Sequence, residues 1–302
     1  VVGFIRPVSS DTVTALIGEA ETGFERWKNT PVSERAACLE RAAQSLEDDT
    51  PRLMGLIIRE AGKTLANAVS EIREAVDFLR YYAAQIRRDL TNDTAAPLGP
   101  VVCISPWNFP LAIFLGQVAA SLAAGNSVLA KAAEETPLIA NEAIRLLHQA
   151  GVPENALQLV CGGGETGAAL VADPRITGVL FTGSTEVAKL IEKQLAKRLN
   201  PDGTPIPLIA ETGGQNALIV ESSALSEQVV ADVLSSAFDS AGQRCSALRV
   251  LCVQEDSADR VLEMLKGAMA ELRTGDPALP QTDVGPVITT KAQAGILHHI
   301  ET

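Results

Sequence analysis

Residues 99–131 read GPVVCISPWNFPLAIFLGQVAASLAAGNSVLAK, and this stretch decides the fold class. Two short runs of β-branched and apolar residues, VVCIS and SVLAK, flank an apolar segment of helical length at 110–124. Similar runs follow at 157–161, 178–182 and 207–211, separated by amphipathic stretches. Strands that alternate with helices pair in parallel and carry helices on both faces of the sheet. The sequence therefore predicts an α/β protein built on a parallel sheet.

The segment before this sheet, about the first ninety residues, shows helical periodicity and no strand pattern. Thr50 and Pro51 are expected to be the N-cap and the first residue of one of its helices. The helices predicted from here to the last strand of the sheet cover residues 9–28, 33–49, 50–62, 64–88, 110–124, 137–150, 165–172 and 185–198.

A boundary between two domains is expected near residue 211. The sequence after it predicts a second α/β section with a helix at 224–241, a strand at 247–253 and a helix at 256–272. No linker rich in proline or serine separates the two parts. We therefore expect residues 1–211 and 212–302 to be two closely packed domains.

The chain of 302 residues is acidic, with a formal net charge of −12 and 46% hydrophobic residues. Such a charge repels nucleic acids and anionic membrane surfaces, so we expect neither as a partner. The longest apolar run, at 111–125, is interrupted by Gly116 and Gln117 and is too short to span a bilayer. These features predict small-molecule chemistry in the cytoplasm. Because the chain begins at Val1 rather than methionine, we expect it to be a piece of a longer protein.

The five cysteines form no CxxC pair and have no histidine at zinc-site spacing. Neither a disulfide framework nor a metal site is therefore expected. Four of them lie in apolar strand-like or helical segments and are predicted to be buried. These four are Cys38, Cys103, Cys161 and Cys252. Only Cys245 follows a polar loop that contains glycine, FDSAGQRC at 238–245, so it alone is predicted to be exposed by its loop rather than packed in the core.

Two glycine-containing turns join expected strands to expected helices, GGGETG at 162–167 and FTGST at 181–185. The first fits the glycine pattern of dinucleotide-binding turns, although the acidic residue that usually follows is not evident. The second offers backbone amides and a helix dipole to a phosphate. Two such turns on one sheet favour a dinucleotide, and a plain glycine-rich turn without a ligand is the alternative for each.

Polar residues also follow the first two strands of the expected sheet. In SPWNFP at 105–110, the rigidly held amide of Asn108 is suited to donate a hydrogen bond to a developing oxyanion. In KAAEETP at 131–137, Lys131 and Glu134 taken by themselves favour a solvated ion pair over a ligand site. Thr136 is expected to cap the helix that follows.

A nucleophilic cysteine commonly needs a base, and histidine is the usual one. The only histidines are His148, in an expected surface helix, and His298 and His299 at the end of the chain, so a cysteine–histidine hydrolase is disfavoured. Glu211 in AETGGQN follows an apolar strand and can serve as a general base that activates water. Cys245 and Glu211 are therefore the candidate catalytic pair.

Taken together and in this order, SPWNFP, KAAEETP, FTGST, ETGGQN and GQRC resemble the motifs of the NAD(P)-dependent aldehyde dehydrogenase superfamily. Within it, GQRCSALR and NPDGTPIPLIAETGGQN are most similar to the L-glutamate γ-semialdehyde (pyrroline-5-carboxylate) dehydrogenase domain of bifunctional proline-utilization enzymes. The resemblance implies a Rossmann-type NAD domain with N-terminal helices, followed by a catalytic domain. It also implies oxidation of L-glutamate γ-semialdehyde to glutamate, with NAD as cofactor, in proline catabolism.

The resemblance further implies a role for each motif residue. Cys245 would attack the aldehyde carbon to form a thiohemiacetal, whose oxyanion the Asn108 amide and the Cys245 backbone N–H would hold. Once hydride has left for nicotinamide, Glu211 would activate the water that hydrolyses the thioester. Lys131 and Glu134 would hold the adenosine ribose. The residues implied for cofactor binding are Ile104, Ser105, Pro106, Trp107, Lys131, Glu134, Gly164, Gly183 and Ser184. Those implied for substrate binding are Phe109, Ser246 and Glu74, and no metal is implied.

Four positions depart from the family pattern without removing a catalytic group: Ala132, Ala188, Thr212 and Gln215. The chain ends before the family's E-x-F-G-P motif, and the segment between RYYA and Gly99 is shorter than the usual dimerization hairpin. We therefore expect residues 212–302 to be the first part of a catalytic domain, and this chain to be inactive by itself.

The intact enzyme is expected to be a homo-oligomer, and the sequence leaves open whether it is fused to a proline dehydrogenase domain. Three alternatives stay open from the sequence: an aldehyde dehydrogenase of other specificity, a non-catalytic NAD-binding module, and a cysteine-dependent acyl transferase or esterase.

Overall fold

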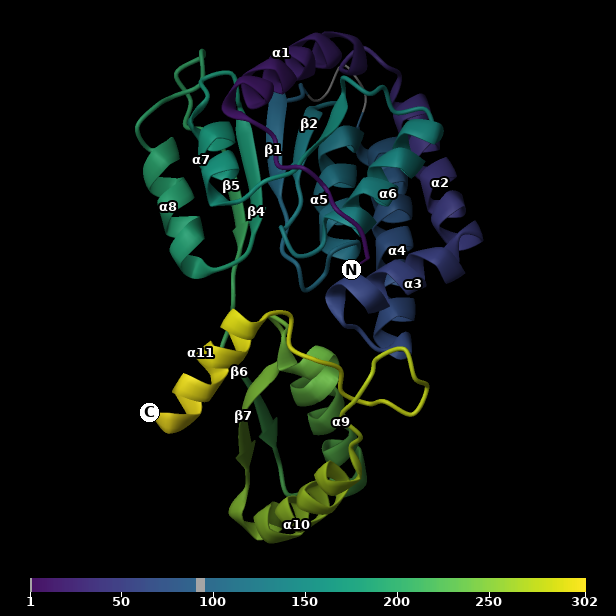
Figure 1. The fold of residues 1–302 in the computed structure, drawn as a ribbon, viewed down its shortest axis with the longest axis vertical. Helices are drawn as coiled ribbons and strands as arrows, with labels where there is room; N and C mark the ends of the chain where they lie inside the picture. The colour runs from purple at the N-terminus through teal and green to yellow at the C-terminus, as the bar shows by residue number, and fades with distance from the viewer. Residues whose placement is uncertain (1, 91–95) are drawn as a thin grey trace. The chain divides into compact units, whose positions relative to one another are not determined.

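The computed structural model describes residues 2–90 and 96–302, which form two compact units (Figure 1). The first unit comprises the residues up to Glu60 together with Val69–Thr212, and the second comprises Ala61–Ala68 together with Gly213–Thr302. The segment expected to be too short for a dimerization hairpin includes residues 91–95, which lie outside the described residues. None of the helices in the described ranges is long and apolar enough to cross a membrane.

Four helices precede the sheet, close to where the periodicity predicts them. They are α1 (Ser10–Trp27), α2 (Val32–Asp48), α3 (Thr50–Ala61) and α4 (Leu65–Asp89). Ser9 caps α1, because its hydroxyl oxygen accepts a hydrogen bond from the Thr12 amide at 3.2 Å. The expected N-cap role of Thr50 is wrong. Thr50 is the first residue of α3, and its hydroxyl donates back to the carbonyl oxygens of Leu46 and Glu47.

The first unit is built on a five-stranded parallel sheet, which confirms the predicted α/β fold class. The strands are β1 (Pro100–Ile104), β2 (Ser127–Lys131), β3 (Leu157–Val160), β4 (Gly178–Thr182) and β5 (Leu208–Glu211), in the order β3-β2-β1-β4-β5. The connecting helices are α5 (Ala112–Ala123), α6 (Pro137–Gln149), α7 (Gly164–Ala172) and α8 (Thr185–Leu195). Because β2 and β4 lie on opposite sides of β1, the strand order reverses between β1 and β4, where such sheets bind ligands.

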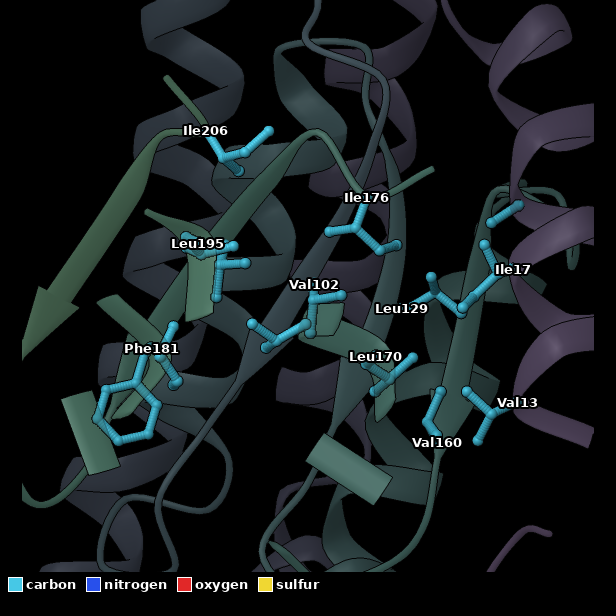
Figure 2. Packing of buried hydrophobic residues seen from close by; sticks show 14 of the residues in the cluster. Val13, Ile17, Val102, Leu129, Val160, Leu170, Ile176, Phe181, Leu195 and Ile206 are labelled. Carbon is cyan, nitrogen blue, oxygen red and sulfur yellow. The ribbon is translucent and has the colours of Figure 1, made fainter. Parts of the chain in front are cut away.

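One face of this sheet packs against α1, α7 and α8 (Figure 2). The strands contribute Val102, Leu129, Val160, Val179 and Phe181, and the helices contribute Val13, Ile17, Ala20, Leu170, Val171, Ala188, Ile191 and Leu195. This set is one continuous hydrophobic core, and it fixes the amino ends of α7 and α8 beside the carboxyl ends of the strands.

The opposite face carries α5 and α6, which α2 covers in turn. Two buried side chains tie the outer helices to the end of α5: Trp27 Nε1 donates to the Leu122 carbonyl oxygen at 2.9 Å, and Arg35 Nε donates to that of Ala123 at 3.0 Å. The Trp27 indole and the Arg35 guanidinium thereby donate to carbonyl oxygens at the end of α5, which have no partners within the helix.

Two glutamates cap the helices of this face from a distance. Glu60 accepts hydrogen bonds from the Leu138 and Ile139 amides at 2.7 and 3.0 Å, at the start of α6. Thr136 is the N-cap residue of α6 as expected, but its side chain makes no capping hydrogen bond. Glu71 likewise accepts from the amides of residues 111 and 112 at 3.0 and 2.9 Å, at the start of α5. Both carboxylates meet the positive end of a helix dipole.

The second unit has two parallel strands, β6 (Asn216–Val220) and β7 (Leu248–Val253), packed against α9 (Ser226–Phe238) and α10 (Glu255–Glu271). Its core consists of Val220, Val229, Val233, Leu248 and Val261. The sequence predicted α9, β7 and α10 but did not identify β6 or the last helix, α11 (Thr290–Glu301).

The predicted burial of Cys252 is wrong, because this cysteine is exposed on β7. It pairs in register with Ile219, which is 84% exposed, whereas Leu218 and Leu251 beside them pack against the core. Side chains alternate between the two faces of a strand, so Cys252 lies on the face away from α9 and α10. A run of apolar residues predicts a strand, but it does not show whether one face or both faces of the sheet are covered.

Candidate active site

In the first unit, the predicted motifs meet at one edge of the sheet, because the carboxyl ends of parallel strands lie together. SPWNFP follows β1, KAAEETP follows β2, GGGETG follows β3 and FTGST covers the end of β4. Glu211 is the last residue of β5. The five strand ends therefore bring together motifs that are more than a hundred residues apart in the chain.

The segment after β1 is partly buried and closely held. The Ser105 side chain is buried, and its amide donates to the Lys131 carbonyl oxygen at 3.1 Å, which continues the pairing of β1 with β2. Asn108 and Phe109 are half-buried. Because Glu71 fixes the amides that follow at the start of α5, both ends of the turn that carries Asn108 are anchored.

Gln117 on α5 joins two strand ends, and the sequence analysis did not identify it as a site residue. Its Nε2 donates to the Ile104 carbonyl oxygen at 3.3 Å and to Thr182 Oγ1 at 2.9 Å. These bonds bridge β1 and β4 at the point where the strand order reverses. The signal available in the sequence was an amide in an otherwise apolar helix, which requires a polar partner.

Lys131 and Glu134 do not form the solvated pair that their sequence also allowed. Lys131 is 7% exposed, and burial lowers its pKa, an effect that the charge of Glu134 partly offsets. Its Nζ donates to the Ala132 carbonyl oxygen at 3.1 Å. An ammonium group has three donors, so a buried lysine at a strand end is suited to bind the hydroxyl groups of a ligand.

The exposed Glu134 side chain lies over the glycine turn after β3. A Cβ on Gly163 would be 2.8 Å from Glu134 Oε1, so a residue larger than glycine would displace this carboxylate. The aliphatic part of Lys131 lies similarly close to Gly167, where a Cβ would be 3.5 Å from Cδ. The glycines of GGGETG therefore leave room for the two charged side chains of the neighbouring motif.

A cavity of about 610 Å³ opens beside this turn, between α7 and α8. Ile104 and Lys131 contribute to its lining from the strand ends, and Gly164, Leu190 and Gln194 contribute from the helices. Its size is within the range of pockets for nucleotide-sized ligands, and a mostly apolar wall with few polar groups suits a flat aromatic base. The residues present at this edge of the sheet therefore fit a nucleotide-type ligand such as a nicotinamide dinucleotide.

The turn after β4 is suited to hold phosphate. Gly183 donates its amide to the Glu211 carbonyl oxygen at 3.1 Å, and a Cβ at this position would lie 2.5 Å from the Phe181 ring. Ser184 caps α8 by accepting from the Val187 amide at 3.3 Å. The Gly183 amide is thus engaged within the sheet, and what this turn offers to an anion is the positive end of the α8 dipole.

Glu211 is exposed and pairs in register with Thr182. Residues paired in a parallel sheet have their side chains on the same face, so Glu211 lies beside the Thr182 hydroxyl that Gln117 contacts. A carboxylate at this position is accessible to water and can act as a base.

In the second unit, the loop before β7 presents Cys245. Both Cys245 and Ser246 are exposed, whereas Ala247 is buried at the start of the strand. Asn216 Nδ2 donates to the carbonyl oxygens of Cys245 and Ala247, at 2.7 and 3.0 Å, and so ties the loop to the first residue of β6. The asparagine of ETGGQN thus supports the cysteine of GQRC, a contact that the sequence analysis did not identify.

The other cysteines differ from Cys245 in exposure or surroundings. Cys38 and Cys103 are buried as predicted, and burial raises the pKa of Cys103 to about 12. Cys161 is half-buried, and burial raises its pKa as well. All five cysteines are free, and no group of side chains in the described ranges is arranged to hold a metal ion.

The predicted site residues are divided between the two units. Asn108, Phe109, Glu211 and the candidate cofactor residues belong to the first unit, as does Glu74, which is exposed on α4. Cys245 and Ser246 belong to the second unit. Each unit thus carries part of the set that the motifs identify.

Comparisons with known proteins agree with one another. The sequence model of the aldehyde dehydrogenase family matches residues 1–302. The bifunctional protein PutA of Klebsiella aerogenes is 61% identical over 302 residues, which cover 100% of this chain and 23% of the relative. A solved structure of proline utilization A with proline bound in remote sites has a TM-score of 0.95 and 53% identity, covering 98% of this chain and 32% of the other.

A second solved structure, of 1-pyrroline-5-carboxylate dehydrogenase from Thermus with bound NAD, has a TM-score of 0.91. It is 32% identical to this chain and covers 98% of it, whereas the chain covers 60% of that structure. The chain therefore spans less than a quarter of the PutA relative and more than half of the smaller dehydrogenase.

Proposed function

The chain belongs to the aldehyde dehydrogenase family, as its motifs predict, and on that premise we propose that it oxidises L-glutamate γ-semialdehyde to glutamate with NAD. The substrate class is supported by relatives named PutA and 1-pyrroline-5-carboxylate dehydrogenase, and it places the reaction in proline catabolism. One observation carries the proposal most directly. Lys131 is buried at a strand end beside Glu134, over a glycine turn and a cavity that fits a nucleotide base.

The proposed cofactor residues are those that converge on the sheet edge. Lys131 and Glu134 would bind the adenosine ribose, Gly183 and Ser184 the pyrophosphate, and the cavity bordered by Gly164 the adenine. Residues 104–107 would line the nicotinamide side. NAD, when bound, supplies the hydride acceptor. A 2′-phosphate would bring further negative charge toward Glu134, which favours NAD over NADP.

The chemical steps that we assign to this chain begin at Cys245. As a thiolate, its sulfur bonds to the aldehyde carbon while the π bond of the carbonyl breaks, and the carbonyl oxygen takes up that electron pair as an oxyanion. The Asn108 amide and the Cys245 backbone N–H donate hydrogen bonds to that oxyanion, which stabilises charge that exists only after attack. Phe109, Ser246 and Glu74 would contact the substrate.

Release of the product requires water. After hydride loss the enzyme carries a thioester on Cys245, and Glu211 removes a proton from the attacking water. The new C–O bond forms as the C–S bond breaks, and the sulfur leaves as thiolate. The product is released as the carboxylic acid, which loses its proton to solvent water. The exposure of Glu211 and its place beside the polar Thr182 support this role.

The partners and location of the protein are part of the same proposal. Because relatives named bifunctional are about four times as long as the region they share with this chain, we propose that the chain acts within a longer protein that includes a proline dehydrogenase domain. We further propose that this protein is a cytoplasmic homo-oligomer.

The experiment is a rapid-mixing measurement of NADH formation by the full-length protein with NAD and L-glutamate γ-semialdehyde. Glu211→Gln should keep the initial burst of NADH and slow later turnovers, because acylation does not need the base. Asn108→Ala should slow the burst itself by about 100-fold to 1,000-fold. Glu221→Gln, which changes another exposed carboxylate, is the control and should behave as wild type. A Glu211→Gln protein without a burst would move the base elsewhere, and a wild type that forms no NADH would refute the function.

A further inference from the structure

The loop that leads to Cys245 follows an unusual backbone path. Ser240 and Ala241 have left-handed conformations, with φ and ψ of 55° and 32° for the first and 56° and 33° for the second. Gly242 continues this path with a φ of 68°. Among the described residues, Ser240 and Ala241 are the only residues other than glycine with positive φ. Side chains with a Cβ adopt this conformation at a cost, and they hold it where surrounding contacts enforce it.

Asn67 supplies such a contact from a distant part of the sequence. Its Oδ1 accepts hydrogen bonds from both the amide and the hydroxyl of Ser240, at 3.0 and 2.9 Å. Asn67 lies in the first turn of α4, where Thr64 Oγ1 accepts from its amide at 3.4 Å and the Thr64 carbonyl accepts from Ala68 at 2.9 Å. All of these residues belong to the second unit. The side chain is therefore held by a capped helix end.

The other groups of the turn are bound as well. The Ser240 carbonyl oxygen accepts from the amide and the side chain of Gln243, at 3.1 and 2.9 Å. Gln243 in turn accepts from the Ile288 amide at 2.9 Å, and Arg249 donates to the Gly242 carbonyl oxygen at 2.8 Å. Gly242 admits no side chain, because a Cβ would lie 2.9 Å from the Ala237 carbonyl oxygen. Asn67 thus supplies the acceptor for the backbone amide of Ser240, the first of the two strained residues.

We propose that Asn67 is a positioning residue, which keeps residues 240–242 in the left-handed path and thereby sets the direction in which Cys245 is presented. The proposal rests on the nucleophilic role assigned to Cys245 above. Without Asn67, the Ser240 amide loses its acceptor and the two strained residues can relax toward ordinary backbone conformations. The turn would then carry Gln243, Arg244 and Cys245 into other orientations. A small misplacement of a reacting group is enough to slow a reaction strongly.

The test uses Asn67→Ala in the full-length protein, with a second substitution that removes the strain. Asn67→Ala should slow the NADH burst by about tenfold to 100-fold, with little change in the KM for NAD. Glycine adopts the left-handed conformation at no steric cost, so Asn67→Ala/Ala241→Gly should recover most of the burst rate. Asn67→Ala/Ser223→Gly is the matched control, since it places a glycine in an exposed turn of the same unit and should recover nothing.

A second measurement does not depend on the oxidation reaction. The rate constant for alkylation of Cys245 by iodoacetamide, followed by peptide mapping, should shift by about threefold or more in Asn67→Ala and return toward wild type only with Ala241→Gly. If wild-type protein forms no NADH, the function fails while this rate still tests the turn. Wild-type burst and alkylation rates in Asn67→Ala would overturn the proposal. Equal recovery by Ser223→Gly would also overturn it, because the effect of Asn67 would then be one of general stability.

Discussion

Replacing Gly23 by alanine should destabilise the first unit, although alanine is the better helix former. Gly23 is buried on α1, and a Cβ there would lie 2.0 Å from the Asn155 carbonyl oxygen, 2.3 Å from its carbon and 2.7 Å from the Ala156 amide nitrogen. Ordinary contacts of this kind are about 3.5 Å, and these atoms belong to backbone that cannot rotate away. The helix would therefore have to retreat by about 1.5 Å, which loosens the packing of Ile17 and Trp27.

The size of the effect follows from two opposing terms. Alanine in a helix interior gains about 1 kcal/mol over glycine. Overpacking a close contact, together with the packing lost as the helix retreats, costs about 3 to 4 kcal/mol. The net expectation for Gly23→Ala is a loss of about 2 to 3 kcal/mol in the free energy of unfolding. Gly18→Ala on the same helix is the matched control: the nearest atom to its Cβ is the flexible end of Arg175 at 3.7 Å, so we expect a gain of about 0.5 to 1 kcal/mol.

The assay is urea unfolding followed by tryptophan fluorescence. The chain has two tryptophans, Trp27 and Trp107, and both lie in the first unit, so the signal reports this unit. The two glycine variants should shift the unfolding midpoint in opposite directions, at similar slopes. A Gly23→Ala midpoint at or above that of wild type would refute the close approach of α1 to residues 155–156.

Two further predictions concern carboxylates of the first unit. Burial raises the pKa of Glu60 above its ordinary value, so the folded state binds this proton more tightly than the unfolded state does. Wild type should therefore exceed Glu60→Gln in free energy of unfolding by the largest amount below about pH 4.5, and this difference should shrink as the pH rises toward 7. Urea unfolding at each pH measures the difference. A difference that grows with pH would contradict the prediction. For the cofactor, Glu134→Ala should weaken NAD and strengthen NADP, and thus lower the preference for NAD by about tenfold in fluorescence titrations. Glu135→Ala removes the same charge from the next position and should leave the ratio of the NADP and NAD dissociation constants near that of wild type. If Glu134→Ala left this ratio unchanged, the Glu134 carboxylate would not contact the ribose.

The sheet of the first unit could be predicted because its signal is local. Short β-branched runs alternate with amphipathic helices, so β1 and β2 appear in the sequence with nearly their observed bounds. The strand ends then locate Lys131, Glu134 and Glu211, and the resemblance to the aldehyde dehydrogenase motifs supplies their expected roles. In the second unit β6 was missed, since it is a short run directly after the glycines of ETGGQN and exposes Ile219 on its outer face.

The supporting contacts could not be predicted, because they depend on side chains that meet only in three dimensions. Glu60 caps α6 across 78 residues of sequence, and Thr136, the expected cap, makes no such bond. Asn67 reaches Ser240 across 173 residues. In each case a single polar residue on a helix has no sequence pattern that identifies its partner. The motifs therefore predict the candidate reacting groups, whereas the residues that contact and support them appear only in the structure.

The second unit is assembled from two stretches of chain, Ala61–Ala68 and Gly213–Thr302, with the whole of Val69–Thr212 between them. This division has a consequence for the order in which the protein folds during synthesis. The strands and helices of the parallel sheet are complete once Glu211 has left the ribosome, so that sheet can form while the rest of the chain is still being made. Residues 61–68 emerge long before the segment that they pack with, and they cannot meet it until the second stretch has been made. The turn that presents Cys245 is thus among the last parts of this chain to form.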